Sequence, residues 1–326
     1  EYTSISHGKH GESQRQGQCH PNPMSQDISA NNRRIAKNTI ALYFRMFFTM
    51  IVSLYTSRVI LQALGVTDYG IFNVVCGLLA VVGLLNSTLS WATARYLTFD
   101  FGKGDHEQLN KTFSMCLNIF ILLSLFYLLL AETIGLWFLN NQMSIPTERI
   151  EAANWIYQFS IISSVLGLLI TPCNGLIFAH EDFSFSALIS IIESILKLIV
   201  AIVIMHSNLD RLILYAFLIL VIAVIVQTFC FLRYKLKYRE VTYIQYWDKK
   251  IFIQILSYSG WNLFGALSNM AKGTGLNVIL NMFFTPAVNA ACGIANQVNG
   301  VVIQFFQSFM TAVNPQITKY YGISFS

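Results

Sequence analysis

The stretch LQALGVTDYGIFNVV, residues 61–75, places a short polar turn between two long apolar runs. Gly65 and Gly70 offer the backbone freedom that a tight turn needs, and Asp68 suits the N-cap of the helix that follows. Each apolar run is long enough to cross a bilayer as a helix. We therefore expect a hairpin between two membrane-spanning helices, with its turn outside the cell.

The composition is that of a membrane protein along the whole chain. Of 326 residues, 55% are hydrophobic and 11% are charged, and the mean hydropathy is +0.54, whereas a soluble domain carries about 25% charged residues. We expect an all-α membrane protein, a polytopic helical bundle. The expected spans are 36–64, 70–94, 112–139, 153–179, 184–206, 211–233, 251–284 and 287–313.

The six cysteines and the N-terminus add no chemistry. The cysteines stand apart, without CxxC or Cys/His spacing, so we expect no disulfide framework, no metal and no cofactor. Residues 1–30 begin with a polar segment that has no hydrophobic period, and we expect a disordered tail there.

The distribution of Lys and Arg predicts the orientation. With the N-terminus inside, thirteen of these residues fall on the inner side and three, Arg58, Arg149 and Arg211, fall on the outer side. This bias predicts a cytoplasmic N-terminus. A basic cluster around residues 234–250 is interpreted as a cytoplasmic linker that touches anionic lipid headgroups. The net charge of +5 is thereby explained, and nucleic acid is not an expected partner.

A short repeat connects the two ends of the chain. GIFNVVCG at 70–77 matches GIANQVNG at 293–300 at five of eight positions. Both copies begin on the same side of the membrane, which is the parallel repeat found in some secondary transporters. The predicted domains are the tail at 1–30, an N-lobe of six helices at 31–233, the linker at 234–250 and the start of a C-lobe at 251–326.

Four features occur in a characteristic order: a long first helix, LGVTDYGIFNVV, FDFGKGDHEQLNKTF before the third span, and PCNGLIFAHEDF after the fourth. Together they resemble polysaccharide-export flippases of the multidrug/oligosaccharidyl-lipid/polysaccharide superfamily, relatives of MATE transporters. The resemblance covers residues 24–322. It implies two six-helix lobes, of which this chain holds one lobe and two helices of the next, so we expect a C-terminally truncated chain.

The resemblance also implies a function. Such a protein flips an undecaprenyl-diphosphate-linked oligosaccharide, a repeat unit of O-antigen, capsule or another surface polysaccharide, across a bacterial inner membrane by alternating access. The implied partners are this lipid-linked oligosaccharide, membrane lipids, and the polysaccharide polymerase and glycosyltransferases.

Two cations in the spans are candidates for binding the diphosphate, because an ionisable residue inside a membrane is costly. Lys272 lies about 18 Å from the outer end of its span, so its ammonium is expected to face a water-filled cavity. The alternative is a structural lysine paired with Glu193 or another carboxylate. Arg45 is placed to bind the diphosphate bidentately, or to snorkel to the cytoplasmic surface. Arg58 and Arg95 are interpreted as interfacial anchors.

Glu193 and Lys197 are four residues apart on one helix face. Such a pair neutralises itself, and this is the favoured interpretation. The functional alternative makes the pair an ion-coupling site, at which Glu193 binds a proton or Na⁺.

A polar stripe on the last predicted span either lines a hydrated lumen for sugar hydroxyls or packs on another helix. The stripe contains Asn289, Gly293, Asn296, Gly300, Gln304, Gln307, Thr311 and Asn314. We favour the lumen, with Asn289, Asn296 and Gln304 as substrate-binding residues. Asn73 on the second span repeats the pattern.

Two other functions remain as alternatives. A cation-coupled multidrug exporter needs an unpaired carboxylate in the first or seventh span, and neither contains one. A polyprenyl-sugar glycosyltransferase or polymerase needs clustered carboxylates on an outer loop. The outer loops offer only Asp68, Glu148, Glu151 and Asp210, interpreted as scattered and unpaired, so we do not expect an enzyme.

Overall fold

The computed structural model describes residues 23–141, 143, 145–283 and 286–324, with side chains left undescribed at 23–35, at 269–298 and at a few other positions. Every regular element in the described ranges is a helix. The expected all-α membrane bundle is confirmed.

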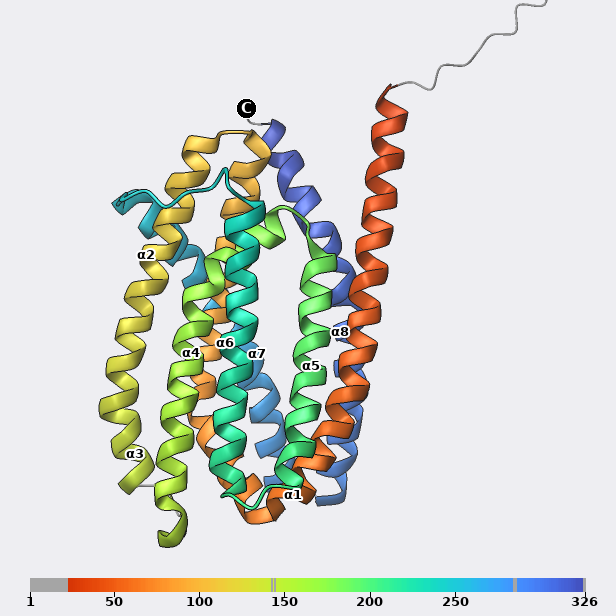
Figure 1. The fold of residues 1–326 in the computed structure, drawn as a ribbon. Coiled ribbons are helices and arrows are strands. Elements are labelled where there is room, and N and C mark those ends of the chain that lie inside the picture. Colours follow the sequence, from red (N-terminus) through yellow and green to blue (C-terminus); the bar gives the residue numbers. More distant parts are fainter. Residues whose placement is uncertain (1–22, 142, 144, 284–285, 325–326) are drawn as a thin grey trace, which may run out of the picture.

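The opening stretch forms the predicted hairpin. Helix α1 runs from Pro23 to Lys103, and its one non-helical residue is Gly65, with φ 78° and ψ 172°. The chain reverses there, giving α1 a first limb before Gly65 and a second limb after it (Figure 1). A positive φ is accessible to glycine without steric cost. Gly70 lies inside the second limb, so the expectation that it also forms the turn was wrong.

The remaining elements follow the predicted spans closely. They are α2 (His106–Leu130), a π-helical turn η1 (Ala131–Gly135), α3 (Leu136–Asn141), a 3₁₀ turn η2 (Thr147–Arg149), α4 (Ile150–Ala179), α5 (Phe183–Met205), α6 (Arg211–Lys237), α7 (Lys249–Phe283) and α8 (Pro286–Ser324). Five stretches within the described residues are long and apolar enough to cross a membrane: 36–73, 106–141, 147–179, 183–205 and 211–237.

The turn between α1 and α2 explains the motif FDFGKGDHEQLNKTF. Gly104 adopts φ 71° and reverses the chain. Asp105 caps α2 by accepting a hydrogen bond from the backbone N–H of Gln108 at 3.0 Å. The hydroxyl of Thr112 donates to the buried carboxyl of Asp100 at 2.6 Å and joins the two helices.

Helix α4 forms the centre of the core, because it packs against α1, α2 and α6. Ile156, Tyr157 and Leu168 of α4 are almost completely buried. The Tyr157 hydroxyl donates to the carbonyl of Ala131 at 2.8 Å. A Cβ on Gly135 would collide with that hydroxyl, so the glycine in the π-helical turn makes room for the tyrosine.

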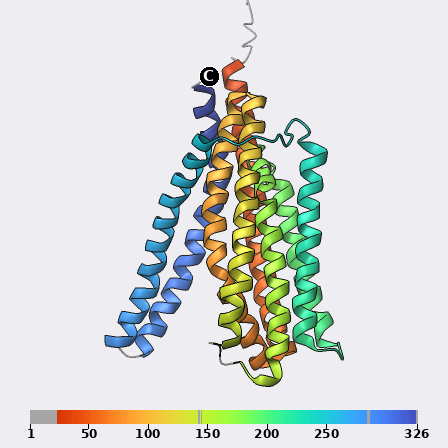
Figure 2. The ribbon, with the colours of Figure 1, turned by 90° about the vertical axis from the view of Figure 1, so that its left-hand side faces the viewer.

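Helices α7 and α8 form a second hairpin beside the helices α1–α6. The end of α7 and the start of α8 lie at the same end of the bundle as the bend in α1, which we call the hairpin end. The opposite end, where the linker runs, is the linker end (Figure 2). Both blue helices lie against the rest of the bundle at the linker end and diverge from it toward the hairpin end. We use N-lobe for α1–α6 and C-lobe for α7–α8.

Candidate functional site

Five of the candidate substrate-binding and ion-coupling residues line two neighbouring cavities. The hairpin-side cavity, about 550 Å³, lies among α1, α5, α6 and α8 and is lined by Asn73, Lys197 and Gln304. The linker-side cavity, about 400 Å³, lies among α1, α4, α5, α6 and α8 and is lined by Arg45 and Glu193. The structure thus brings these side chains together along one face of the first limb of α1.

The pair predicted on α5 is formed. Lys197 Nζ lies 2.6 Å from Glu193 Oε1, which is the i,i+4 contact expected on a helix. Glu193 borders the linker-side cavity and Lys197 borders the hairpin-side cavity. The ion pair therefore stands between the two cavities, where it is accessible from both.

The hairpin-side cavity is rich in hydroxyl groups. Thr56 lines it and is 6% exposed, and its hydroxyl has no hydrogen-bond partner among the described residues. The Thr49 hydroxyl instead donates to the carbonyl of Arg45 at 2.8 Å. A buried hydroxyl without a partner costs stability, so a polar ligand or water at Thr56 would offset that cost.

A third cavity, about 750 Å³, lies between the second limb of α1 and the C-lobe. The Arg95 guanidinium stacks over the Tyr258 ring at 4.8 Å, a favourable cation–π arrangement. Asn262 also lines this cavity, and its buried amide nitrogen has no partner among the described residues. Trp91 and Asn314 are also part of its wall. We call this the interlobe cavity.

Sequence reasoning missed the interlobe cavity because it interpreted Arg95 as an interfacial anchor. A signal was present: Ser87, Thr88, Trp91 and Arg95 follow one another at helical spacing and share one face of the second limb. The partners of Arg95 lie more than 160 residues later in the sequence, on α7. No local pattern connects them.

The polar stripe on α8 serves more than one cavity. Gln304 lines the hairpin-side cavity, Thr311 the linker-side cavity and Asn314 the interlobe cavity. The side chains of Lys272, Asn289 and Asn296 lie outside the described residues, so their predicted roles stay predictions.

At the linker end, Glu181 connects the two lobes. This residue, 5% exposed and with φ 55°, accepts hydrogen bonds from Gln316 at 3.0 Å and Lys319 at 2.9 Å, both on α8. Close by, the second limb of α1 touches α8 at Gly102, where an added Cβ would lie 2.8 Å from the backbone oxygen of Lys319. The lobes are therefore in direct contact at this end.

The next residue, Asp182, ties the N-lobe together internally. Its carboxylate accepts from Arg233 at 2.6 Å, from Lys237 at 2.8 Å and from the Tyr238 hydroxyl at 3.0 Å. Burial raises the pKa of Asp182, but the hydrogen bonds from Lys237, Arg233 and Tyr238 outweigh burial and hold the pKa below its ordinary value of 3.8.

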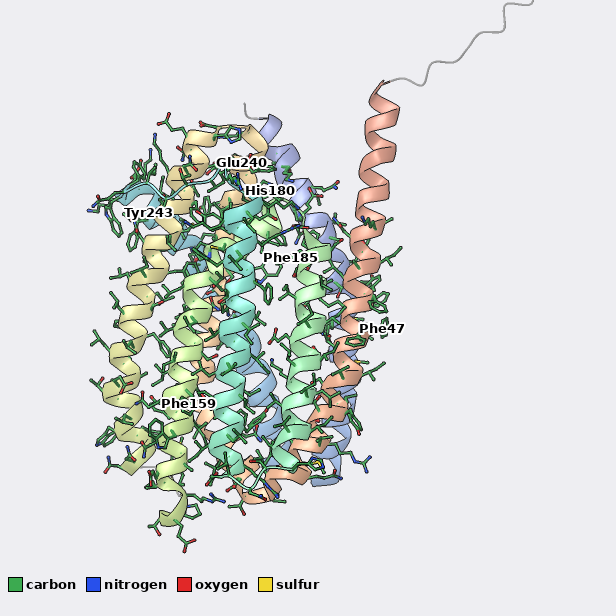
Figure 3. All side chains as sticks on the ribbon, in the orientation of Figure 1. Phe47, Phe159, His180, Phe185, Glu240 and Tyr243 are labelled. Carbon is green, nitrogen blue, oxygen red and sulfur yellow. The ribbon has the colours of Figure 1, made fainter. Side chains whose placement is uncertain are left out.

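His180, two residues before Asp182, lies beside the Asp182 ion-pair group and contacts Tyr238. Its ring stacks on Tyr238 at 4.2 Å, and its Nε2 lies 3.4 Å from a Glu240 carboxylate oxygen. Figure 3 shows His180 and Glu240 together at the linker end, above Phe185. The motif residues 180–182 thus form the main polar junction at this end.

At the hairpin end, the expectation of scattered, unpaired outer carboxylates was wrong for Asp68 and Asp210. Arg149 binds Asp68 at 2.9 Å and Asp210 at 2.6 Å. Asp68, Arg149 and Asp210 belong to three segments that are far apart in the sequence, so sequence spacing gave no sign that they lie close together. The group joins the α1 hairpin to the starts of α4 and α6.

The comparisons with known proteins concern the fold. No protein-family model matches the sequence, and no curated protein matches it closely enough to count as a relative. Several solved structures are similar, and three of them illustrate the likeness. An outward-facing multidrug resistance MATE family transporter of the MOP superfamily has TM-score 0.75 and 15% identity over 90% of this chain. A MATE protein in complex with MaD3S has TM-score 0.76 and 15% identity over 90% of this chain and 66% of its own.

The third, a MOP superfamily transporter from Pyrococcus furiosus described as having a binding pocket of reversed polarity, has TM-score 0.69 and 16% identity over 89% of this chain and 65% of its own. The present chain spans 65% of the length of the outward-facing transporter. At this level of identity the likeness concerns architecture. The chain has the helical fold of the MATE transporters of the MOP superfamily.

Proposed function

We propose that this chain forms part of a membrane transporter that flips an undecaprenyl-diphosphate-linked oligosaccharide. The observation that carries the proposal is the charge of the three cavities. Among the described residues, the charged side chains that line them are Arg45, Arg95 and Lys197 against one carboxylate, Glu193, which Lys197 already neutralises. A net positive, partly hydrated interior suits a diphosphate and its sugars.

Arg95 is the residue best placed to bind the diphosphate. Its guanidinium is oriented by the Tyr258 ring and has planar donors that match phosphate oxygens. The unpartnered Asn262 amide in the same cavity is a donor for a sugar or phosphate oxygen. In this proposal Arg45, Lys272, Asn73, Asn289, Asn296 and Gln304 contact the cargo elsewhere along its path.

The closed linker end supports an outward-facing arrangement. If that end is cytoplasmic, as the Lys and Arg distribution predicts, the Glu181 contacts with α8 seal the inner side. The protein would then reside in a bacterial inner membrane with its N-terminus in the cytoplasm, and alternating access would require the contacts to break.

The alternative is a cation-coupled exporter of the MATE type, which the same fold supports equally. The favouring observation is Glu193, a carboxylate that lines the linker-side cavity beside Arg45. In that reading, occupancy of Glu193 by a proton or Na⁺ competes with the Lys197 pair. A cationic drug, however, would meet three cavities with little negative charge.

Equilibrium binding to the purified full chain separates the two functions. The probes are radiolabelled undecaprenyl-diphosphate-N-acetylglucosamine and the lipophilic cation tetraphenylphosphonium. Arg95→Gln should weaken binding of the diphosphate about ten- to hundredfold, because it removes a charge-assisted bidentate contact. Arg58→Gln is the matched control, because Arg58 is exposed and lines none of the three cavities.

Tight binding of tetraphenylphosphonium, with no measurable binding of the diphosphate, would favour the exporter instead. A cellular test complements this measurement. Cells whose intact gene carries Arg95→Gln should accumulate lipid-linked oligosaccharide on the inner leaflet, and normal flipping in those cells would contradict the role of Arg95.

A further inference from the structure

We propose that the outer surface of the N-lobe contains a binding site for one anionic phospholipid of the leaflet at the linker end. The site is a groove between α2 and α6, with α4 as its floor. Its lining differs from that of the cavities assigned to cargo except for Gln227, which also borders the linker-side cavity. The inference is independent of which cargo the protein transports.

The groove has the shape and chemistry of an acyl-chain site. Its volume is about 480 Å³, and its walls are mainly apolar, including Phe113 and Leu117 of α2, Leu169 of α4, and Val224 and Phe231 of α6. Along α6 the lining residues extend from 224 to 235, about 16 Å at 1.5 Å per residue. This length is close to one leaflet of a hydrocarbon core about 30 Å thick.

A cation stands at the mouth of the groove. Lys235 lines the groove, is exposed, and has its Nζ 5.7 Å from the centre of the Phe231 ring. The two nearby basic residues, Arg233 and Lys237, each form an ion pair with Asp182. Within the described part of the chain, no carboxylate lies within ion-pair distance of Lys235. The Lys235 ammonium is therefore available to pair with an anion from outside the protein.

The linker borders the groove through Tyr243. The Tyr243 hydroxyl donates to Asn118 at 3.2 Å, and the backbone N–H of Ile244 donates to Ser114 at 2.9 Å, so the linker is fixed to α2. Tyr243 also lines the groove, and Figure 3 shows it at the linker end beside α2. A headgroup held between Lys235 and Tyr243 would contact the segment that joins the two lobes.

These features select an anionic phospholipid over a neutral one. One acyl chain fills the apolar groove, and the phosphate oxygens and the net negative charge of the headgroup meet Lys235. Gln227 and Thr228 are the polar groups partway along the groove, and the Thr228 hydroxyl is already bonded to the carbonyl of Val224 at 2.7 Å. A single lysine near a membrane surface gives about a fivefold preference for the anionic headgroup.

Native mass spectrometry of the full chain, delipidated in detergent, measures this preference. The probes are dioleoylphosphatidylglycerol and dioleoylphosphatidylcholine, titrated separately and in competition. We expect one tight site, with about fivefold stronger binding of phosphatidylglycerol. Lys235→Gln should bring the ratio close to one, and Lys249→Gln, which removes an exposed charge at the start of α7, should leave it unchanged.

The groove itself is tested by filling it. Thr228→Trp places an indole in the groove and should abolish the tight site for both lipids, whereas Ile225→Trp adds the same bulk to the exposed lipid-facing side of α6 and should not. The proposal is overturned if Lys235→Gln retains the preference, if Thr228→Trp retains the tight site, or if undecaprenyl phosphate displaces phosphatidylglycerol at equal concentration.

Discussion

Replacing Gly102 with alanine should open the linker end. Gly102 lies in the last turn of the second limb of α1, where α8 crosses it. An ideal Cβ at this position would be 2.8 Å from the Lys319 oxygen and 2.9 Å from its Cα. Both are backbone atoms of α8, so no side chain can turn aside to relieve the overlap.

The magnitude follows from this geometry. Restoring an ordinary contact distance requires α8 to move by roughly 0.5 Å, and overpacking of this kind costs about 1–3 kcal/mol. Alanine also favours the helix over glycine by about 1 kcal/mol, but that gain is the same whether the lobes touch or separate. Only the overlap changes the balance, so the ratio of closed to open linker ends should fall about 5- to 150-fold.

Electron–electron distance measurements between nitroxides on Leu236 of α6 and Ile317 of α8 report this change, because both residues are exposed. The labels are placed in a background without native cysteines. Gly102→Ala should shift the distribution toward longer distances. Gly83→Ala is the matched control, because it adds a methyl group to the same limb with no atom within 4 Å. Identical distributions for both variants and the parent would refute the reasoning.

Three further predictions concern stability in detergent. Arg149→Gln removes the cation shared by two carboxylates and should cost about 1–2 kcal/mol, seen as a lower unfolding midpoint, while Arg58→Gln should not. The pKa of Asp182 is depressed by folding, so its contribution is complete above its ordinary value of 3.8 and is lost as pH falls below it. Asp182→Asn should therefore flatten the acid side of a plot of unfolding midpoint against pH, and an unchanged slope would contradict this. Gly135→Ala should destabilise by about 1–3 kcal/mol, and adding Tyr157→Phe should recover part of the loss because it removes the colliding hydroxyl.

The helices were predictable because membrane helices obey a local rule, and five stretches of the described residues meet it in length and composition. Each must satisfy its backbone hydrogen bonds internally and present apolar side chains over a fixed length. The choice between Gly65 and Gly70 was not predictable in this way. Both are compatible with a turn, and only the packing of the finished hairpin decides which one adopts the positive φ.

The candidate site was predictable only where its parts are close in sequence. The Glu193–Lys197 pair follows from helical spacing alone. The Arg149 group and the Arg95–Tyr258 stack depend on connections between elements far apart in the chain. Charge and helical position indicate which residues are costly to bury, but they do not identify the partner that offsets the cost.

Two adjacent carboxylates at the linker end have different structural roles, and this division bears on how the lobes can separate. Asp182 binds Arg233 and Lys237 of α6, within the N-lobe, whereas Glu181 binds Lys319 of α8, across the lobes. The positive φ of Glu181 is uncommon outside glycine and carries a backbone cost of about 1–3 kcal/mol. That conformation lets consecutive side chains reach different lobes. Asp182 therefore holds the N-lobe together, while separation of the lobes has to break the Glu181 contacts and the Gly102 approach at this end, together with the contacts that α1 makes with α7 and α8 elsewhere.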